Sequence, residues 1–337
     1  GVRPCFRPST RSSSSHSARP TMLRAGPLLL IRTFENVGAG GPVTPLGLLY
    51  LAASVRARFG TARPVEILDL GLHEEPLVVL RRALGEARPA IVGLSALSCE
   101  AGFLSQVASE VKSSCGADLP VIVGGPHATV AREALLHDEG VDFVVFGEGE
   151  RTLVEVLEAL EADGPLRAIG GLAWRNEGVA VANHARSFAA DLDELPFPAW
   201  DLVDLDAYAG LPNWNGILKG SRYATMATSR GCPYRCKYCH NYFGKRVRAR
   251  SPENVLAEME ILVREKGVDE IHIVDDVFNL DFRRAMTISS LVQQRLPGLS
   301  FAFPNGLRAD IMRPELIGAL VAMGTYRIVY GVESVTP

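Results

Sequence analysis

The stretch Gly231-Cys232-Pro233-Tyr234-Arg235-Cys236-Lys237-Tyr238-Cys239-His240 directly follows a predicted strand over residues 223–228 and carries three cysteines. The C-x3-C-x2-C spacing lets one short loop wrap three thiolates around a compact metal centre. Structural zinc usually takes four ligands in two separated pairs, and the sequence offers no second pair. The histidine next to the last cysteine rarely has the reach to close the same tetrahedron. We therefore favour an iron–sulfur cluster with one open iron over zinc, a disulfide or coincidence.

The sequence around this stretch alternates between short strands and helices. Ser251 can cap the first helix, Pro252 suits its first turn, and Glu253 favours the positive end of the helix dipole. Four strand–helix units of this length predict the first half of a β/α barrel, truncated after its fourth strand. Strands are predicted at 223–228, 270–275, 300–304 and 326–331, and helices at 252–266, 282–295 and 313–323.

The earlier part of the chain, from Pro27 to about Leu160, shows the same alternation with strands that are almost entirely apolar. Strands of a parallel sheet need this composition, because helices cover both of its faces. We therefore predict an α/β fold that begins with a doubly wound, Rossmann-like parallel sheet. Strands are predicted at 28–32, 65–69, 90–95, 121–124 and 143–146, helices at 46–59, 75–86, 100–114, 129–137 and 150–161, and a hairpin at 171–175 and 179–181.

Small residues stand at the ends of most of these strands. Gly124-Gly125 and Gly147 lie at the ends of two of them, and Ser95 ends a third. Glycine lets the backbone approach a ligand closely, and ligands of such sheets bind beyond the carboxyl ends of the strands. The pattern favours a wide cofactor lying across this edge, with ordinary turns as the alternative. No strand is followed by the glycine fingerprint of dinucleotide-binding folds.

The predicted domains are residues 27–182, which hold the first sheet, and residues 223–337, which hold the partial barrel. A proline-bearing linker, residues 183–222, joins them. Residues 1–26 are rich in arginine and serine and free of acidic residues, a composition that is typical of transit peptides. A disordered leader, or a non-native extension ahead of a true start near Met22, is the favoured interpretation. We also expect the chain to be a fragment at its C-terminal end.

The chain has 337 residues, of which 22% are charged and 47% are hydrophobic, with a formal net charge of -3. This balance gives no general electrostatic footprint for nucleic acid. A basic run at residues 245–250 suggests either RNA or a loop beside the cysteines, and the acidic balance of the chain favours the loop. The longest apolar run, residues 46–55, is too short to span a membrane. Few and clustered cysteines indicate a reducing compartment, so we expect a cytoplasmic protein.

The cysteine spacing, with an aromatic residue before the last cysteine, resembles the signature of the radical S-adenosylmethionine superfamily. Other stretches of residues 27–337 are similar to the branch of that superfamily with an N-terminal cobalamin-binding domain. The resemblance implies a Rossmann-like cobalamin-binding domain followed by a radical S-adenosylmethionine core. The stretches that carry it are Asp275-Asp276-Val277-Phe278, Asn305-Gly306-Leu307-Arg308, Gly331-Val332-Glu333-Ser334, Gly124-Gly125-Pro126-His127 and Gly147-Glu148-Gly149-Glu150.

By this resemblance, the three cysteines ligate three irons of a [4Fe-4S] cluster, and S-adenosylmethionine binds the fourth iron. Asp275 and Asp276 stand where many relatives carry Gly-Gly-Glu, and carboxylates suit the amino group of that ligand. An ion pair between Asp276 and Arg308 is the alternative. The implied cluster ligands are Cys232, Cys236 and Cys239, and the implied S-adenosylmethionine contacts are Tyr238 at the adenine, Asp275, Asp276, Asn305, Arg308 at the methionine carboxylate, and Glu333 and Ser334 at the ribose or amino groups.

The same resemblance implies cobalamin at the glycine-rich edge of the first sheet. The chain lacks the Asp-x-His-x-x-Gly motif that often supplies a histidine to cobalt, and it reads Asp69-Leu70-Gly71-Leu72-His73 instead. We therefore expect cobalamin with its base tail displaced and no histidine on its lower face. His127 is expected to form a hydrogen bond to the corrin or its tail. The implied cobalamin contacts are Ser95, Gly124, Gly125, His127, Gly147 and Glu148.

These cofactors imply an enzyme that cleaves S-adenosylmethionine reductively to a 5′-deoxyadenosyl radical. Methylation of an unactivated carbon or phosphorus centre is the favoured reaction, with a non-methylating radical cyclase or rearrangement enzyme as the alternative. A non-catalytic corrinoid-binding protein would leave the cysteine loop without a role, and a zinc module would leave the glycine-edged sheet without one. The implied partners are a small-molecule substrate and an external electron donor of the flavodoxin or ferredoxin type.

Overall fold

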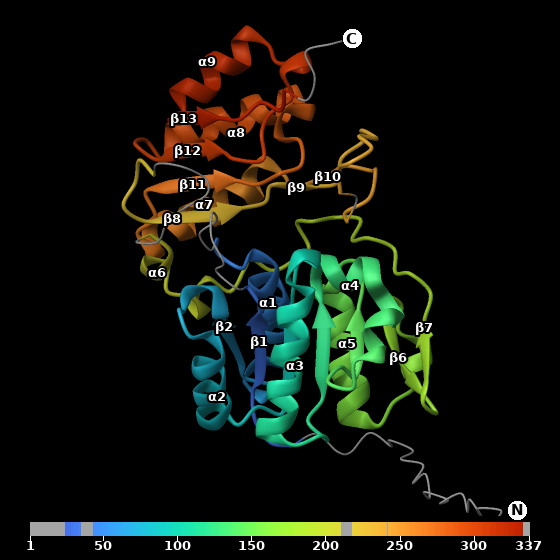
Figure 1. The fold of residues 1–337 in the computed structure, drawn as a ribbon. Helices are drawn as coiled ribbons and strands as arrows, with labels where there is room; N and C mark the ends of the chain where they lie inside the picture. Colours follow the sequence, from blue (N-terminus) through green and yellow to red (C-terminus); the bar gives the residue numbers. More distant parts are fainter. Residues whose placement is uncertain (1–23, 35–42, 210–217, 241, 333–337) are drawn as a thin grey trace, which may run out of the picture.

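The computed structural model describes residues 24–34, 43–209, 218–240 and 242–332. These residues fold into two α/β halves, each built on a mainly or wholly parallel sheet. In Figure 1 the N-terminal sheet occupies the lower half of the molecule, and the second sheet occupies the upper half.

The N-terminal sheet carries its strands in the order β2-β1-β3-β4-β5-β6-β7. The strands β1 to β5 pair in parallel, which confirms the predicted parallel sheet. The predicted hairpin extends this sheet, because β6 pairs with β5 in antiparallel fashion. The bounds are β1 (Leu28–Arg32), β2 (Val65–Asp69), β3 (Ile91–Ser95), β4 (Val121–Gly124), β5 (Phe143–Val145), β6 (Leu172–Asn176) and β7 (Val179–Ala182).

Helices cover both faces of this sheet, as a doubly wound fold requires. On one face, α1 (Leu46–Phe59) and α5 (Gly149–Ala162) pack against the strands and against each other. On the other face lie α2 (Pro76–Ala87), α3 (Ala101–Cys115) and α4 (Gly125–Ala131). The central strands are therefore buried on both sides, which accounts for their nearly continuous apolar sequence.

One helix of this half differs from its prediction at residues 129–137. The helix α4 begins at Gly125, immediately after β4, and the 3-10 helix Arg132–His137 occupies the rest of the predicted span. The φ of 45° at Arg132 ends α4. Gly125 has a φ of +87°, and a Cβ atom there would come 2.6 Å from Ser95 Oγ. The direct passage from strand to helix therefore needs glycine at this position.

The second sheet pairs its strands in parallel, in the order β13-β12-β11-β8. The helices α7, α8 and α9 pack against one face, on which Ile271, Ile273 and Phe301 are buried. Ser251 Oγ accepts a hydrogen bond from Asn254 N–H at 3.2 Å, which confirms the predicted helix cap. The bounds are β8 (Tyr223–Met226), β11 (Glu270–Ile273), β12 (Ser300–Phe303), β13 (Thr325–Ile328), α7 (Pro252–Lys266), α8 (Phe282–Arg295) and α9 (Pro314–Ala322).

A short antiparallel ribbon, which the sequence did not predict, closes the cysteine-bearing loop. Its strands are β9 (Ser229–Arg230) and β10 (Arg248–Ala249), and their pairing sets Arg230 opposite Arg248. In Figure 1 the loop between them projects beside the second sheet. The loop, residues 231–247, therefore enters and leaves the fold at one narrow neck.

Apolar and polar contacts join the two halves. Leu49 of α1 and Trp200 of the connecting segment belong to the apolar core of the second half. Tyr208, in α6 (Asp206–Ala209), donates its hydroxyl to Asp69 Oδ2 at 3.0 Å, at the end of β2.

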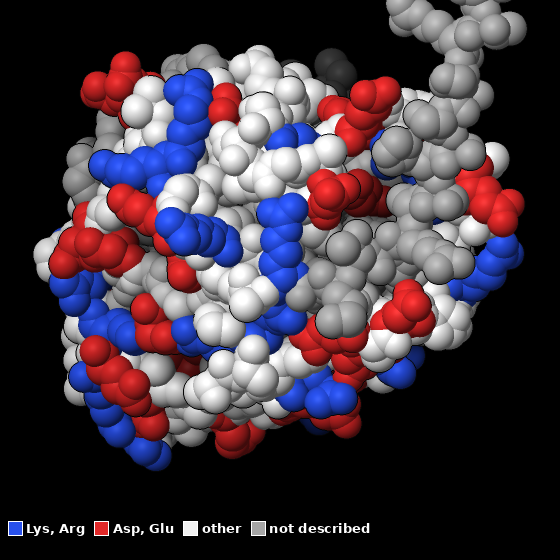
Figure 2. All heavy atoms as spheres, turned by 90° about the horizontal axis from the view of Figure 1, so that it is seen from below, with Lys and Arg blue, Asp and Glu red and all other residues white. Residues whose placement is uncertain are grey.

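The face of the N-terminal half that points away from the second sheet carries mixed charge. Figure 2 shows lysine and arginine side chains interspersed with aspartate and glutamate over this face. The described residues therefore form no broad basic surface here of the kind that binds nucleic acid. Across the part of the chain that the structure describes, no helix is both long and apolar enough to cross a membrane.

Candidate functional site

A cavity of about 450 Å³ lies where the carboxyl edge of the N-terminal sheet meets the second half. Residues at the ends of β3, β4 and β5 line one side, and residues from the ribbon, the cysteine loop and the ends of β11 and β12 line the other. A cavity shared in this way can bring two ligands, one from each half, into contact. Its polar lining residues are Tyr50, Ser95, Thr129, Glu148, Glu150, Ser229, Arg230, His240, Tyr242, Asp276 and Asn305.

Most of the residues predicted to contact cobalamin lie together on this cavity. His127 differs, because its Nδ1 lies 3.3 Å from Ser98 Oγ and its backbone N–H donates to Ala96 O. Among the described residues, His127 stands outside the cavity lining, so its predicted contact with the corrin gains no support. The predicted residues that do line the cavity are Ser95, Gly124, Gly125, Gly147 and Glu148.

The cavity continues as an apolar slot between the sheet and the helices α1 and α5. Leu30 and Val145 line the slot from the strands, and Leu153 lines it from α5. A Cβ atom at Gly124 would meet nothing closer than 3.8 Å, and one at Gly147 would meet nothing within 4 Å. These glycines therefore leave open space that a side chain would fill. A glycine-edged opening above an apolar slot fits cobalamin, which combines a broad ring with a flat apolar base tail.

The cysteine loop extends from the ribbon that lines the cavity. Cys236 and Cys239 are exposed, and Cys232 is half-buried. The backbone N–H of Cys232 donates to Gly244 O at 3.2 Å, and that of Cys239 donates to Cys236 O at 3.3 Å. Burial, followed by the charges of the other two thiols, raises the pKa of Cys239. Cys232 and Cys236 therefore both lie within electrostatic reach of Cys239.

The chemistry of this donor set fits an iron–sulfur cluster, because thiolates are the ligands that such clusters take. Ligands of one zinc ion meet at a single point, whereas each cysteine of a cluster binds a different iron. Within the described residues, no group of three or more His, Cys, Asp or Glu side chains is arranged so that it could hold a metal ion. Three cysteines on one loop would satisfy three irons of such a cluster and leave the fourth for another ligand.

The two aspartates after β11 take different positions. Asp276 lines the cavity, and its Oδ2 accepts a hydrogen bond from Gly231 N–H at 3.1 Å. Asp275 is buried, and both of its oxygens accept hydrogen bonds from Thr228 and Ser229. Burial raises the pKa of Asp275, against the effect of these hydrogen bonds. Asp276 is therefore the aspartate that faces the space where the amino group of a ligand could lie.

His240, the residue after the third cysteine, also lines the cavity. Its ring stacks on Tyr242 with 4.9 Å between centroids, and its Nε2 lies 3.3 Å from Asp276 Oδ1. The hydrogen bond with Asp276 raises the pKa of His240, although partial burial opposes this shift. The imidazole is thus held by the carboxylate at the end of β11.

The other predicted S-adenosylmethionine contacts are spread over the site. Asn305 lines the cavity and donates to Val274 O at 2.7 Å. Tyr238 lies on the cysteine loop with an exposed side chain. Glu333 and Ser334 lie outside the described residues.

Arg308 borders the cysteine loop rather than the cavity. Its Cζ lies 3.9 Å from the centroid of the Tyr234 ring, and its guanidinium lies 2.6 Å from Asp310 Oδ2. The alternative ion pair between Asp276 and Arg308 is wrong, because in the described part of the chain these residues pair with His240 and Asp310 instead.

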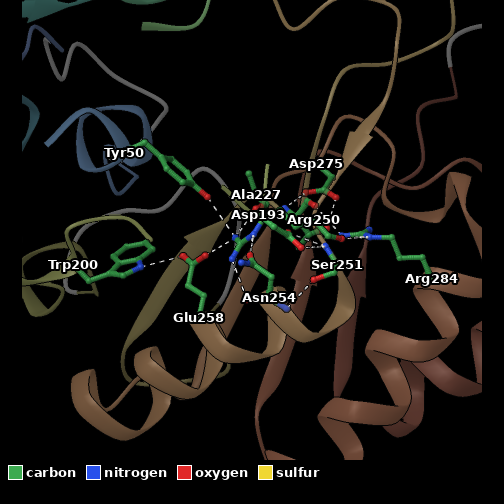
Figure 3. Close-up of polar contacts among 11 residues, drawn as sticks. Tyr50, Asp193, Trp200, Ala227, Arg250, Ser251, Asn254, Glu258, Asp275 and Arg284 are labelled. Carbon is green, nitrogen blue, oxygen red and sulfur yellow. Dashed lines mark hydrogen bonds and ion pairs between the residues drawn. The ribbon is translucent and has the colours of Figure 1, made fainter. Parts of the chain in front are cut away.

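A buried polar network beneath the ribbon was not predicted. Arg250 and Glu258 form an ion pair whose side chains are both buried. Trp200 Nε1 donates to Glu258 Oε1 at 3.1 Å, and Arg250 donates to Ala227 O at 3.1 Å. Figure 3 shows these side chains converging on Arg250, with Tyr50 approaching from α1. The network therefore anchors the exit of the cysteine loop to both halves.

Two family models match the chain, in the order of its two halves. The B12 binding domain matches residues 36–157, and the radical SAM superfamily matches residues 226–337. The first match covers β2 to β5 with the glycine edge, and the second covers the cysteine loop and the strands β11 to β13.

Relatives are found over most of the chain. It is 32% identical over 305 residues to an uncharacterised methyltransferase of Pyrococcus horikoshii, with 89% of this chain and 62% of that protein covered. It is 27% identical over 332 residues to the cytidylyl-2-hydroxyethylphosphonate methyltransferase of Streptomyces wedmorensis, with 86% and 61% covered. The chain thus spans about three fifths of the length of these curated relatives.

Among solved structures, the fold is similar to that of TsrM from Kitasatospora setae, a radical S-adenosylmethionine methyltransferase solved with cobalamin and a [4Fe-4S] cluster bound. The TM-score is 0.70 at 22% identity, with 90% of this chain and 58% of that chain covered. At this identity the likeness shows the fold. The chain therefore carries a B12 binding domain followed by a radical SAM superfamily domain, which is the domain order of radical S-adenosylmethionine enzymes with an N-terminal cobalamin-binding domain.

Proposed function

We propose that the protein is a cobalamin-dependent radical S-adenosylmethionine enzyme that methylates an unactivated carbon or phosphorus centre of a small molecule. The observation that carries this proposal is the shared cavity, on which the glycine edge of one half and Asp276 of the other half meet. The methyltransferase names of the relatives at 32% and 27% identity support methylation over the radical cyclisation that the name of a relative at 24% identity indicates.

Each half would contribute one set of contacts. Cys232, Cys236 and Cys239 would hold the cluster, and Asp276 would hold the amino group of S-adenosylmethionine. Gly124, with the other glycines of the sheet edge, would let the corrin approach the backbone. When bound, the cluster and S-adenosylmethionine supply one-electron radical chemistry, and cobalamin supplies a transferable methyl group.

The lower face of cobalamin would lack a histidine ligand. Asp69 opens the stretch in which other cobalamin proteins carry their cobalt-binding histidine. Here Asp69 is buried and already accepts hydrogen bonds from Arg32 at 3.2 Å and Tyr208 at 3.0 Å. Because these donors already bind the carboxylate of Asp69, it is not free to orient a histidine on cobalt. This supports binding of cobalamin with its base tail displaced into the apolar slot.

The reaction would draw electrons from an external one-electron donor of the flavodoxin or ferredoxin type, and we place the protein in the cytoplasm. The support for a reducing compartment is the state of the described cysteines, all of which are free thiols. Clustered thiols that must bind iron need such surroundings.

The products formed from S-adenosylmethionine test the proposal without knowledge of the substrate. The protein is reconstituted with iron, sulfide and reduced cobalamin and is then given S-adenosylmethionine and a low-potential reductant. Methylation predicts both S-adenosylhomocysteine and 5′-deoxyadenosine. A radical cyclase predicts 5′-deoxyadenosine alone, and a corrinoid carrier predicts neither product.

A further inference from the structure

The neck of the cysteine loop brings two like charges together. Arg230 and Arg248 lie directly opposite each other in the antiparallel ladder of β9 and β10. Their side chains are only 8% and 5% exposed. Two guanidinium groups this close and this poorly solvated repel each other unless an anion lies between them.

A single carboxylate from the other half supplies that anion. Glu148 Oε1 lies 3.1 Å from Arg230 NH1 and 2.7 Å from Arg248 NH1. The other oxygen, Oε2, accepts the backbone N–H of Ala189 at 2.8 Å. Glu150 adds a second contact, with its Oε1 2.7 Å from Arg230 NH2. Because protein donors bind both oxygens of Glu148, its carboxylate is fixed to the neck.

Aromatic rings restrict the two arginines further. Arg230 lies 5.0 Å from the centroid of the Tyr50 ring and 5.5 Å from that of Phe243. Arg248 lies 4.8 Å from the centroid of Phe188 and also donates to Ala189 O at 2.9 Å. Guanidinium groups with fixed hydrogen bonds and ring contacts are held in both position and orientation.

The short loop that carries Glu148, between β5 and α5, also borders the cobalamin side of the cavity. Gly147 and Gly149 flank Glu148, and all three residues line the cavity. Arg230 is separated from Cys232 by one residue, Gly231, whose φ of +93° and close approach to Arg246 O leave no room for a side chain. A displacement of Glu148 would therefore move the cysteine loop relative to the glycine edge.

We propose that Glu148 is a positioning residue that sets the separation between the cobalamin edge and the cysteine loop by clamping Arg230 and Arg248. This inference rests on the proposed function, because it concerns the distance between the two cofactors of that function. Transfer between two bound groups tolerates displacements of only about 1 Å. A buried group of ion pairs can fix such a distance, because removing the carboxylate of Glu148 would leave the charges of the two arginines poorly compensated.

The first test follows backbone hydrogen exchange at the neck, residues 229–232 and 248–250, in protein without cofactors. Glu148→Gln keeps the shape of the side chain and removes its charge, so we expect exchange there to become roughly tenfold faster or more. Glu161→Gln is the matched control, because Glu161 also lies on α5 and its ion pair is with Arg63, which precedes β2. Unchanged exchange at the neck in the Glu148 variant would overturn the proposal.

A milder variant covers the case in which Glu148→Gln does not fold. Arg248→Lys keeps the positive charge but cannot hold Glu148, Ala189 O and Phe243 O at once, as the arginine does. We expect faster exchange at the neck than in the native protein, with a smaller change than in Glu148→Gln. Exchange at the native rate in Arg248→Lys would contradict the clamp as well.

The second test measures the cobalt-to-cluster distance by pulsed electron paramagnetic resonance on protein loaded with both cofactors. We expect a broader distance distribution in Glu148→Gln and an unchanged one in Glu161→Gln. A native distribution in Glu148→Gln refutes the positioning role. Iron and cobalt are counted on the same samples, so that failure of the native protein to load refutes the proposed function separately.

Discussion

His240 Nε2 lies 3.3 Å from Asp276 Oδ1, which ties the residue after the third cysteine to the end of β11. The other oxygen of the same carboxylate accepts the N–H of Gly231, the residue before the first cysteine. One aspartate therefore fastens both ends of the cysteine stretch to the second sheet. It does so from the cavity wall, where it can also meet a ligand.

Asp276→Asn should weaken binding of S-adenosylmethionine by roughly tenfold or more, because a charge-assisted hydrogen bond to an ammonium group is lost. Calorimetric titration of the reconstituted protein measures this change. Asp201→Asn is the control, since Asp201 forms a surface ion pair with Arg56 and such pairs contribute little. Equal affinity in Asp276→Asn and the native protein would remove Asp276 from the ligand site.

Gly124→Val should block cobalamin without damage to the fold. The new side chain would project into open space on the cavity wall, where the nearest atom to a Cβ is 3.8 Å away. We expect the affinity for hydroxocobalamin, followed by absorbance, to fall by about tenfold or more, because the new atoms occupy ligand space. We expect the Tm to change by about 2 °C or less.

Gly85→Val is the control for Gly124→Val. Gly85 lies on the exposed side of α2, where a Cβ atom would also meet nothing within 4 Å. Cobalamin affinity should stay native in this variant. If both valine variants bind hydroxocobalamin equally well, cobalamin does not occupy the glycine-edged opening.

Glu258→Gln should destabilise the protein by about 3–5 kcal/mol, because the buried Arg250 would lose its counter-charge. Denaturant unfolding measures the loss, and the fluorescence of Trp200 should change, since its Nε1 donates to Glu258. Glu260→Gln on the same helix removes pairings with the exposed Arg264 and Arg295 and should change stability by about 1 kcal/mol or less. Similar unfolding midpoints for the two variants would show that the buried network adds no stability.

Cys236→Ala should abolish the iron–sulfur absorbance of the reconstituted protein, because one iron would lose its thiolate. Cys99→Ala should leave the absorbance unchanged, since Cys99 is an exposed thiol at the carboxyl side of β3. A chain that keeps its full iron content after Cys236→Ala would require a different ligand set.

Local patterns predicted most of the fold. The buried strands of the first sheet could be located because each is a short apolar run between polar or glycine-rich turns. Ser251 and Pro252 marked the start of α7 for a similar reason, since a cap and a first-turn proline act on neighbouring residues. The start of α4 was missed because Gly124-Gly125-Pro126 has the composition of a turn, although here it opens a helix. The domain boundaries at 182 and 222 stay a prediction.

The parts of the site that depend on distant residues could not be predicted. Glu148 and Arg230 are 82 positions apart, and each belongs to a segment that alone resembles an exposed loop. The sequence does not distinguish the roles of Asp275 and Asp276. The path of the chain after β11 buries Asp275 and directs Asp276 to the cavity. The cysteine cluster was recognisable because all of its ligands lie on one loop.

The most direct test of the central claim is the content of iron, labile sulfide and cobalt per polypeptide. The protein would be reconstituted without oxygen, supplied with hydroxocobalamin and freed of unbound metal. We predict about four irons and about one cobalt per chain, with sulfide equal to iron. Iron without cobalt would remove cobalamin-dependent methylation, and cobalt without iron would contradict the radical mechanism.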